Sequence, residues 1–144
     1  MILPDANLLI YAYHPGAAQH ESSRKWLEYV LSRSEAVRFA WMTLSGFLRI
    51  MTNPKVFEQP LSIAEAVGIV SSWLERPNVD ILEPGDRYWV ILQELLVNAQ
   101  CTGTLVSDAA LAALAIEHGA ILHTTDQDFA RFDGLTWKNP LKTS

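Results

Sequence analysis

Short segments of strand-forming residues alternate with longer segments of helical periodicity, and this alternation constrains the fold more than any other feature. Strands that alternate with helices form a mainly parallel sheet with helices packed on both faces. We therefore predict an α/β fold, with three layers (α/β/α) around a mainly parallel central sheet of four to five strands. The predicted strands are 2–4, 37–43, 79–84, 120–125 and 135–137.

The segments between these strands have apolar residues at helical spacing and recognisable helix ends. Ser62 and Glu65, three residues apart, are typical of a capping box. Asp86 precedes an apolar helical segment as an N-cap would, and Gly119 follows another as a C-cap would. The predicted helices are 8–13, 17–34, 43–53, 62–76, 86–99, 105–119 and 126–132.

The chain has 144 residues, and we expect residues 1–144 to form a single domain. Its net charge of −5 argues against nucleic-acid binding through bulk electrostatics, but it allows an enzyme that approaches nucleic acid through bound cations. The single cysteine, Cys101, cannot form an internal disulfide, and no apolar run reaches the ~20 residues that span a bilayer. These features predict a cytoplasmic protein that does not contact a membrane.

Four aspartates mark places where the predicted chain reaches one edge of the sheet. Asp5 ends the first strand, and Asp126 and Asp128 follow the fourth. Asp108 lies near the start of a helix, where the chain has just crossed the same edge. Because sites in open parallel sheets form beyond the carboxyl ends of the strands, we expect these side chains to converge.

A simpler interpretation makes Asp5, Asp108 and Asp126 helix N-caps, a position that aspartate fills well. Caps need only be spread over the surface, whereas these carboxylates would converge. Two like charges ~4 Å apart repel by roughly 4 kcal/mol at an effective dielectric near 20, against a total stability of about 5–15 kcal/mol. A convergent cluster must therefore be partly protonated or neutralised by a cation.

Hard oxygen ligands in a shallow, wet site suit Mg²⁺ or Mn²⁺. Zinc fits less well, because Cys101 is alone and the four histidines have no ligand spacing. No Gly-rich nucleotide-binding loop and no G-x-S-x-G nucleophile elbow is present, so those enzyme classes have no support. The candidate catalytic and metal-binding residues are Asp5, Asp108, Asp126 and Asp128.

Four motifs, in order along the chain, resemble the PIN domain family. They are D-A-N-L-L-I-Y-A after the first strand, F-L-R-I-M-T-N-P, V-S-D-A-A-L-A-A-L-A-I-E-H-G-A and T-T-D-Q-D-F-A-R-F. Near the end, G-L-T-W-K-N-P is similar to the tail of the VapC toxins of actinobacterial toxin–antitoxin pairs. The resemblance covers nearly the whole chain.

The resemblance implies a Mg²⁺- or Mn²⁺-dependent ribonuclease that acts as the toxin of a toxin–antitoxin pair. Its partners would be RNA and a VapB-type antitoxin, and the chain would form a homodimer. Asp5 and Asp108 would be the principal metal ligands. Asp126 matches a third position, and Asp128 matches a further one.

The resemblance also implies roles for neighbouring side chains. Asn7 and the hydroxyl of Thr124 or Thr125 would orient water or the ligands. Many PIN domains carry a glutamate just before F-L-R, where this chain has Gly46. That departure weakens the case for a second tightly bound metal.

Two alternatives stay open at this point. The chain could be a catalytically decayed module that only binds a partner, although four retained aspartates argue against this. Arg49 and Lys55 are candidates for RNA contact, against the simpler interpretation that they lie on a solvated helix face. The helices at 17–34 and 62–76 would form a groove for an antitoxin segment and the homodimer contact, as the resemblance implies.

Overall fold

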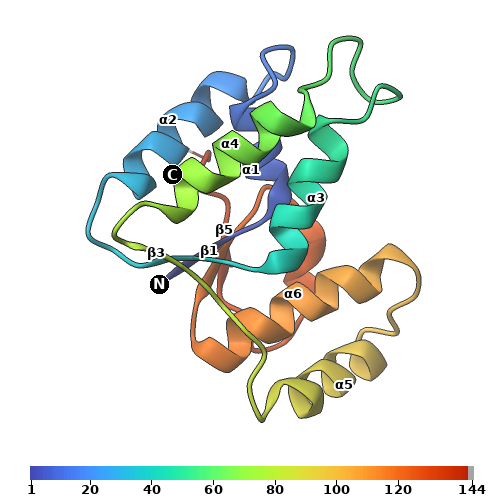
Figure 1. Cartoon of the computed structure of the whole chain (residues 1–144). Coiled ribbons are helices and arrows are strands. Elements are labelled where there is room, and N and C mark those ends of the chain that lie inside the picture. The colour runs from blue at the N-terminus through green and yellow to red at the C-terminus, as the bar shows by residue number, and fades with distance from the viewer. Residues whose placement is uncertain (143–144) are drawn as a thin grey trace.

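A parallel sheet forms the centre of the molecule, as the computed structural model of residues 1–142 shows (Figure 1). The strand order is β3-β2-β1-β4-β5, and every pairing of neighbours is parallel. The predicted α/β class and the five strands are therefore confirmed. The strands are β1 (Ile2–Pro4), β2 (Val37–Phe39), β3 (Val79–Ile81), β4 (Ile121–His123) and β5 (Trp137–Lys138).

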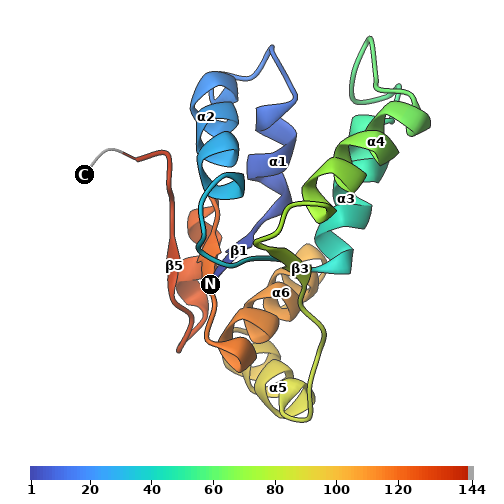
Figure 2. The same ribbon diagram turned by 60° about the vertical axis from the view of Figure 1, so that its left-hand side comes forward.

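Helices cover both faces of this sheet and give the predicted three layers (Figure 2). The first four helices lie on one face, and α5 and α6 lie on the other (Figure 1). No helix within residues 1–142 has the length and apolar character needed to cross a bilayer. The helices are α1 (Ala6–Ala12), α2 (His20–Leu31), α3 (Trp41–Met51), α4 (Ile63–Leu74), α5 (Tyr88–Asn98), α6 (Thr104–His118) and the 3₁₀ helix η1 (Gln127–Arg131).

Each face of the sheet has its own hydrophobic core. Beneath α1–α4, the Trp73 ring stacks on Phe39 with centroids 5.6 Å apart and contacts Phe47 at 4.8 Å. On the opposite face, the buried side of α6 carries small residues such as Ala109 and Ala112, which let the helix lie close to the sheet.

Most strands are shorter than predicted. The strand predicted at 37–43 ends at Phe39, because Trp41 already begins α3. A run of strand-forming residues continues across this boundary, so composition alone does not reveal where the backbone turns. The strands predicted at 79–84 and 120–125 likewise end at Ile81 and His123.

The prediction that Asp86 caps α5 is wrong. Arg87 occupies the N-cap position, and its side chain makes no capping hydrogen bond. The Glu117 carboxylate instead accepts from the backbone N–H groups of Gly85 at 2.7 Å and Arg87 at 3.0 Å. A long-range contact from α6 thus replaces the local cap.

The predicted capping box at the start of α4 is confirmed, and it gives a test of local stability. The Ser62 hydroxyl accepts from the Glu65 N–H, and the Glu65 carboxylate accepts from the Ser62 N–H, both at 3.1 Å. We expect Ser62→Ala to lower the free energy of unfolding by about 1 kcal/mol, measured by urea denaturation. Ser71→Ala, in the same helix, is the control and should change it little. Equal effects of the two substitutions would contradict this role.

Candidate metal centre

The pairing of β1 with β4 brings the ends of two distant segments together. Pro4 is the register partner of His123, and the Asp5 N–H donates to the His123 carbonyl at 2.9 Å. The next residue along the chain after β4, Thr124, donates its hydroxyl proton to Asp5 Oδ2 at 2.8 Å. Asp5 therefore ends the first strand in contact with the segment that follows the fourth.

Asp5 and Asp126 also act as helix caps, so the cap and cluster interpretations do not exclude each other. Asp5 Oδ1 accepts from the Ala6 N–H at 2.7 Å at the start of α1. Asp126 Oδ1 accepts from the Asp128 N–H at 2.9 Å at the start of η1. The Asp126 N–H in turn donates to the Thr124 hydroxyl at 3.0 Å, which ties this turn to Asp5.

Asp108 is not a cap, because it lies in the second turn of α6, which begins at Thr104. Burial raises its pKa to about 6, and the nearby negative charges add to the rise. Arg131 has the opposite, lowering effect. The carboxylates that raise the pKa of Asp108 are Asp5, Asp126 and Asp128. The charges of the three other predicted aspartates therefore act on Asp108.

The pKa of Asp5 is also raised, chiefly by burial, and the charge of Asp126 contributes to the rise. Two hydrogen bonds oppose this effect by stabilising the ionised form, one from the Thr124 hydroxyl and one from the Ala6 N–H. These donors aim at different oxygens of the same carboxylate. Asp5 is therefore held in a fixed orientation at the centre of the cluster.

The side-chain oxygen of Asn7 accepts no hydrogen bond from any group in residues 1–142. Its Nδ2 group donates to the hydroxyls of Thr124 at 3.3 Å and Thr125 at 2.9 Å. Because the Thr124 proton already goes to Asp5, Thr124 can only accept from Asn7, and this fixes the amide orientation. The Asn7 Oδ1 atom is buried without a partner among residues 1–142. An unpaired buried acceptor beside carboxylates fits a site completed by a hydrated cation.

The arrangement fits a hard cation better than zinc. Within residues 1–142, no group of three or more His, Cys, Asp or Glu side chains is placed so that it could hold a metal ion. Mg²⁺ keeps several waters and needs only one or two carboxylates, whereas a zinc site needs three or four protein ligands. The Asp128 side chain is 62% exposed, so water reaches this edge of the sheet.

Two further features concern the rim of the cluster. Arg131 is not among the residues predicted from sequence, although it follows Asp128 by one helical turn; its Nη2 lies 3.7 Å from Asp128 Oδ1. At Gly46, where the resemblance leads one to expect glutamate, an added Cβ atom would meet no other atom within 4 Å. Arg49 and Lys55 are exposed and make no ion pair within the described residues.

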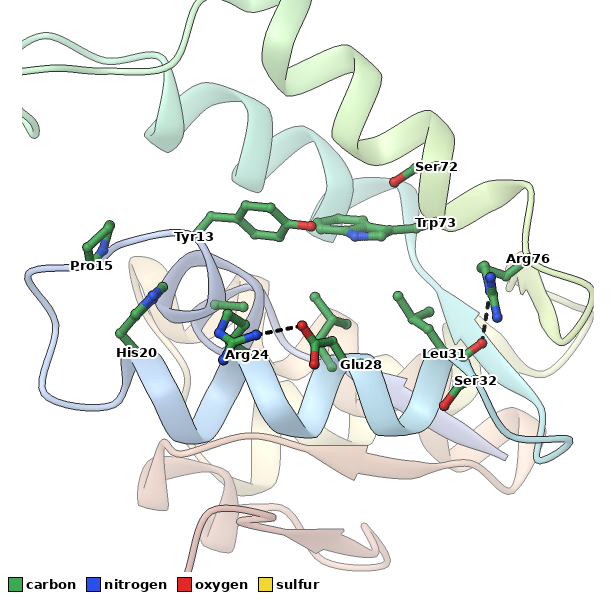
Figure 3. A pocket seen from close by; sticks show the side chains of 12 residues that line it. Tyr13, Pro15, His20, Arg24, Glu28, Leu31, Ser32, Ser72, Trp73 and Arg76 are labelled. Atoms are coloured by element: carbon green, nitrogen blue, oxygen red, sulfur yellow. Dashed lines mark hydrogen bonds and ion pairs between the residues drawn. The ribbon is translucent and has the colours of Figure 1, made fainter.

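A hollow of about 650 Å³ lies away from the cluster, between α2 and α4 (Figure 3). Trp73 forms part of its wall, and its Nε1 atom is buried without a partner among residues 1–142. Arg24 and Glu28 are joined by a hydrogen bond of 2.7 Å along α2, and Arg76 Nε donates to the Leu31 carbonyl at 3.0 Å. The hollow is thus an apolar groove with charged rims.

Comparison with known proteins assigns the family. Residues 2–135 match the PIN domain family. Ribonuclease VapC33 of Mycobacterium tuberculosis is 40% identical over 142 residues, which cover 99% of each chain. Ribonuclease VapC37 of the same organism is 39% identical over 140 residues, or 97% of each chain. The chain therefore belongs to the PIN domain family and, within it, to the VapC ribonucleases.

A solved structure supports the same fold. VapBC2 from Rickettsia felis, bound to a DNA fragment from its promoter, aligns with a TM-score of 0.70 at 19% identity. The alignment covers 96% of this chain and 98% of that one. The predicted PIN-like architecture is confirmed by this likeness.

The raised pKa of Asp108 predicts a pH-dependent stability in EDTA. A carboxyl group whose pKa is higher in the folded state binds more protons when the chain is folded. Its contribution to the free energy of unfolding is therefore lost as pH rises through the folded pKa, which is about 6 for Asp108. Asparagine does not ionise, so Asp108→Asn removes this loss of stability. We expect the melting temperature of Asp108→Asn, relative to wild type, to increase between pH 4 and pH 7.

The control for the loss of one negative charge is Asp86→Asn, an exposed aspartate outside the cluster, and the comparison is between the two variants at each pH. An offset for Asp108→Asn that is the same at pH 4 and pH 7 would show that folding does not raise the pKa of Asp108.

Proposed function

We propose that this VapC ribonuclease hydrolyses RNA phosphodiester bonds with Mg²⁺ or Mn²⁺ held by Asp5 and Asp108. The observation that supports the proposal is the place of the Asp108 carboxyl group, whose pKa is raised to about 6 chiefly by burial and further by the charges of Asp5, Asp126 and Asp128. Four mutually repelling carboxylates at one sheet edge destabilise the folded chain unless a cation neutralises them. A function that needs the cation explains why the fold tolerates these carboxylates.

The side chains around the cation have separate tasks. The Thr124 hydroxyl and the Ala6 N–H keep Asp5 ionised and oriented. Asn7 Oδ1, which has no donor within residues 1–142, accepts a hydrogen bond from water at the site. Asp126 and Asp128 lie on the more exposed side, where they position the attacking water or complete the cation's ligands. The cation, when bound, lowers the pKa of water and offsets charge that develops on the phosphate.

One cation suits this chain better than two. The open space at Gly46 means that α3 contributes no carboxylate at that position. The alternative of a decayed, non-catalytic module loses support, because the four aspartates are charge-coupled and relatives of 39–40% identity are named ribonucleases.

A substitution at Asp5 separates the ligand role from the cap role. Asparagine caps a helix about as well as aspartate, so Asp5→Asn keeps the bond from Ala6. It removes one charge from the cluster and also the acceptor of the Thr124 hydroxyl proton; we expect the loss of charge repulsion to outweigh the lost bond, so that the variant melts above wild type in EDTA. Saturating Mg²⁺ should stabilise wild type by about 2.7 kcal/mol at one hundred times the dissociation constant, and the variant should lose most of that gain and its RNA cleavage.

The outcome that would contradict this role is a variant that cleaves RNA like wild type and melts identically in EDTA and in Mg²⁺. Cleavage by wild type in EDTA that equals cleavage in Mg²⁺ would contradict metal dependence itself. The control is again Asp86→Asn, which should keep both the Mg²⁺-dependent rise in melting temperature and the cleavage.

The groove between α2 and α4 is the proposed binding site of a VapB-type antitoxin segment (Figure 3). Its apolar wall includes Leu27 and Trp73, while Arg24 and Arg76 provide charge at the rims.

A homodimer is also proposed, with its contact on the outer face of α4. Ile63 and Val67 lie one helical turn apart there and are 61% and 48% exposed. Two large apolar side chains on one exposed helix face favour a contact with a second copy. Cytoplasmic action on RNA is consistent with this assembly and is part of the same proposal.

Filling the groove should block the antitoxin and spare the ribonuclease. Ser72 lines the groove, whereas its neighbour Ser71 does not. We expect Ser72→Trp to weaken binding of the co-expressed antitoxin at least tenfold and to leave Mg²⁺-dependent RNA cleavage intact. Val97→Trp, at a 74% exposed position of α5 on the other side of the sheet, is the control and should bind normally. Unchanged antitoxin affinity in Ser72→Trp, measured by calorimetry, would place the antitoxin elsewhere.

A further inference from the structure

A second hollow, of about 620 Å³, lies between α2 and the side of the sheet formed by β1, β4 and β5. Ile121 and His123 line it, while Leu122 between them belongs to the core beneath α5 and α6. Lys138, the register partner of His123, lines the same hollow from β5. The alternation along β4 therefore directs one buried imidazole and one neighbouring lysine toward this space.

The hollow gathers positive charge in a chain that is acidic overall. Lys25, Arg33 and Lys138 line it, against one carboxylate, Glu35. The whole chain has 11 Lys and Arg residues against 16 Asp and Glu. None of the three basic side chains has an ion-pair partner within residues 1–142, so their charges face solvent or a ligand.

His123 adds a directed donor to this charge. The residue is 6% exposed, and the Trp26 indole Nε1–H donates to its Nδ1 atom at 3.2 Å. An indole can only donate, so Nδ1 accepts and the imidazole proton resides on Nε2. This Nε2–H has no acceptor among the described residues, and the ring lines the hollow. A nearly buried N–H group thus lacks an acceptor that an anion would supply.

The α2 side of the hollow offers an aromatic surface. Tyr29 is 56% exposed, and the Arg33 guanidinium lies 4.6 Å from the centre of its ring. Bases stack on such rings, and arginine planes add to the stacking. His123 is followed directly by Thr124, whose hydroxyl donates to Asp5, so the hollow adjoins the carboxylate cluster along β4.

We propose that this hollow binds a nucleotide unit of the RNA that flanks the cleaved bond. Its phosphate would contact Lys25, Lys138 and the His123 Nε2–H, and its base would lie against Tyr29. The inference rests on the proposed ribonuclease function, because it assigns the hollow to that enzyme's substrate. It also explains how an acidic protein holds a polyanion: cationic side chains bind the flank while the metal centre binds the reacting phosphate.

The test uses a fluorescein-labelled single-stranded RNA of about 12 nucleotides, with binding measured by anisotropy in EDTA so that no cleavage occurs. We expect Lys25→Gln/Lys138→Gln to bind more weakly and to reduce the slope of log K against log[NaCl] by about 1.4, roughly 0.7 for each lost phosphate contact. Arg87→Gln/Lys142→Gln removes the same charge at two exposed positions that do not line the hollow, and it should keep the wild-type slope. An unchanged slope in the first variant, or an equal fall in both, would overturn the inference.

Two further measurements separate the possible failures. The Mg²⁺-dependent rise in melting temperature should persist in both double variants. If wild type shows no such rise, the proposed metal centre is wrong, whereas the anisotropy measurement still tests RNA binding in the hollow. In ¹⁵N spectra, we expect AMP to shift the Trp26 Nε1 signal. Addition of the RNA should displace the bound AMP and reverse that shift. AMP binding that the RNA does not displace would identify a free-nucleotide site and overturn the assignment to substrate.

Discussion

The parallel pairing of β1 with β4 is the contact on which the candidate site depends. It places Asp5 beside Thr124, although 119 positions separate them, and the Thr124 hydroxyl then bonds Asp5, Asp126 and Asn7. A single short strand pair thus determines where two carboxylates from opposite ends of the chain lie. The third segment, α6, contributes Asp108 from a helix packed against the same sheet through its small buried residues.

The carboxylates that would bind the cation lower the stability of the folded chain when no metal is bound. Burial and like charges raise the pKa of Asp108 and of Asp5, which means that the folded, metal-free chain resists full ionisation of the cluster. Hydrogen bonds from Thr124 and from the start of α1 offset the effect at Asp5. Arg131 offsets it at Asp108. A divalent cation would neutralise the negative charge that remains. Carboxyl groups with pKa values perturbed in this way are typical of functional sites.

Much of this could be predicted from sequence, because the relevant signals are local. Helical periodicity, the capping box at Ser62 and the position of Asp5 after an apolar segment together indicate the fold class and the edge where carboxylates meet. Long-range contacts could not be predicted in this way. Glu117 replaces the expected Asp86 cap from 30 residues away, and the Trp26–His123 bond depends on how α2 lies across the sheet. The end of β2 at Phe39 was missed because strand-forming residues continue into α3.

The most direct test of the central claim is the location of a bound paramagnetic cation. Substoichiometric Mn²⁺ broadens the amide signals nearest to it in ¹⁵N–¹H spectra. We predict early loss of the signals from residues 5–7, 107–109 and 124–128, with the α4 signals retained and the loss reversed by EDTA. Broadening that is absent, or that is centred on another part of the chain, would contradict a cation site shared by Asp5 and Asp108.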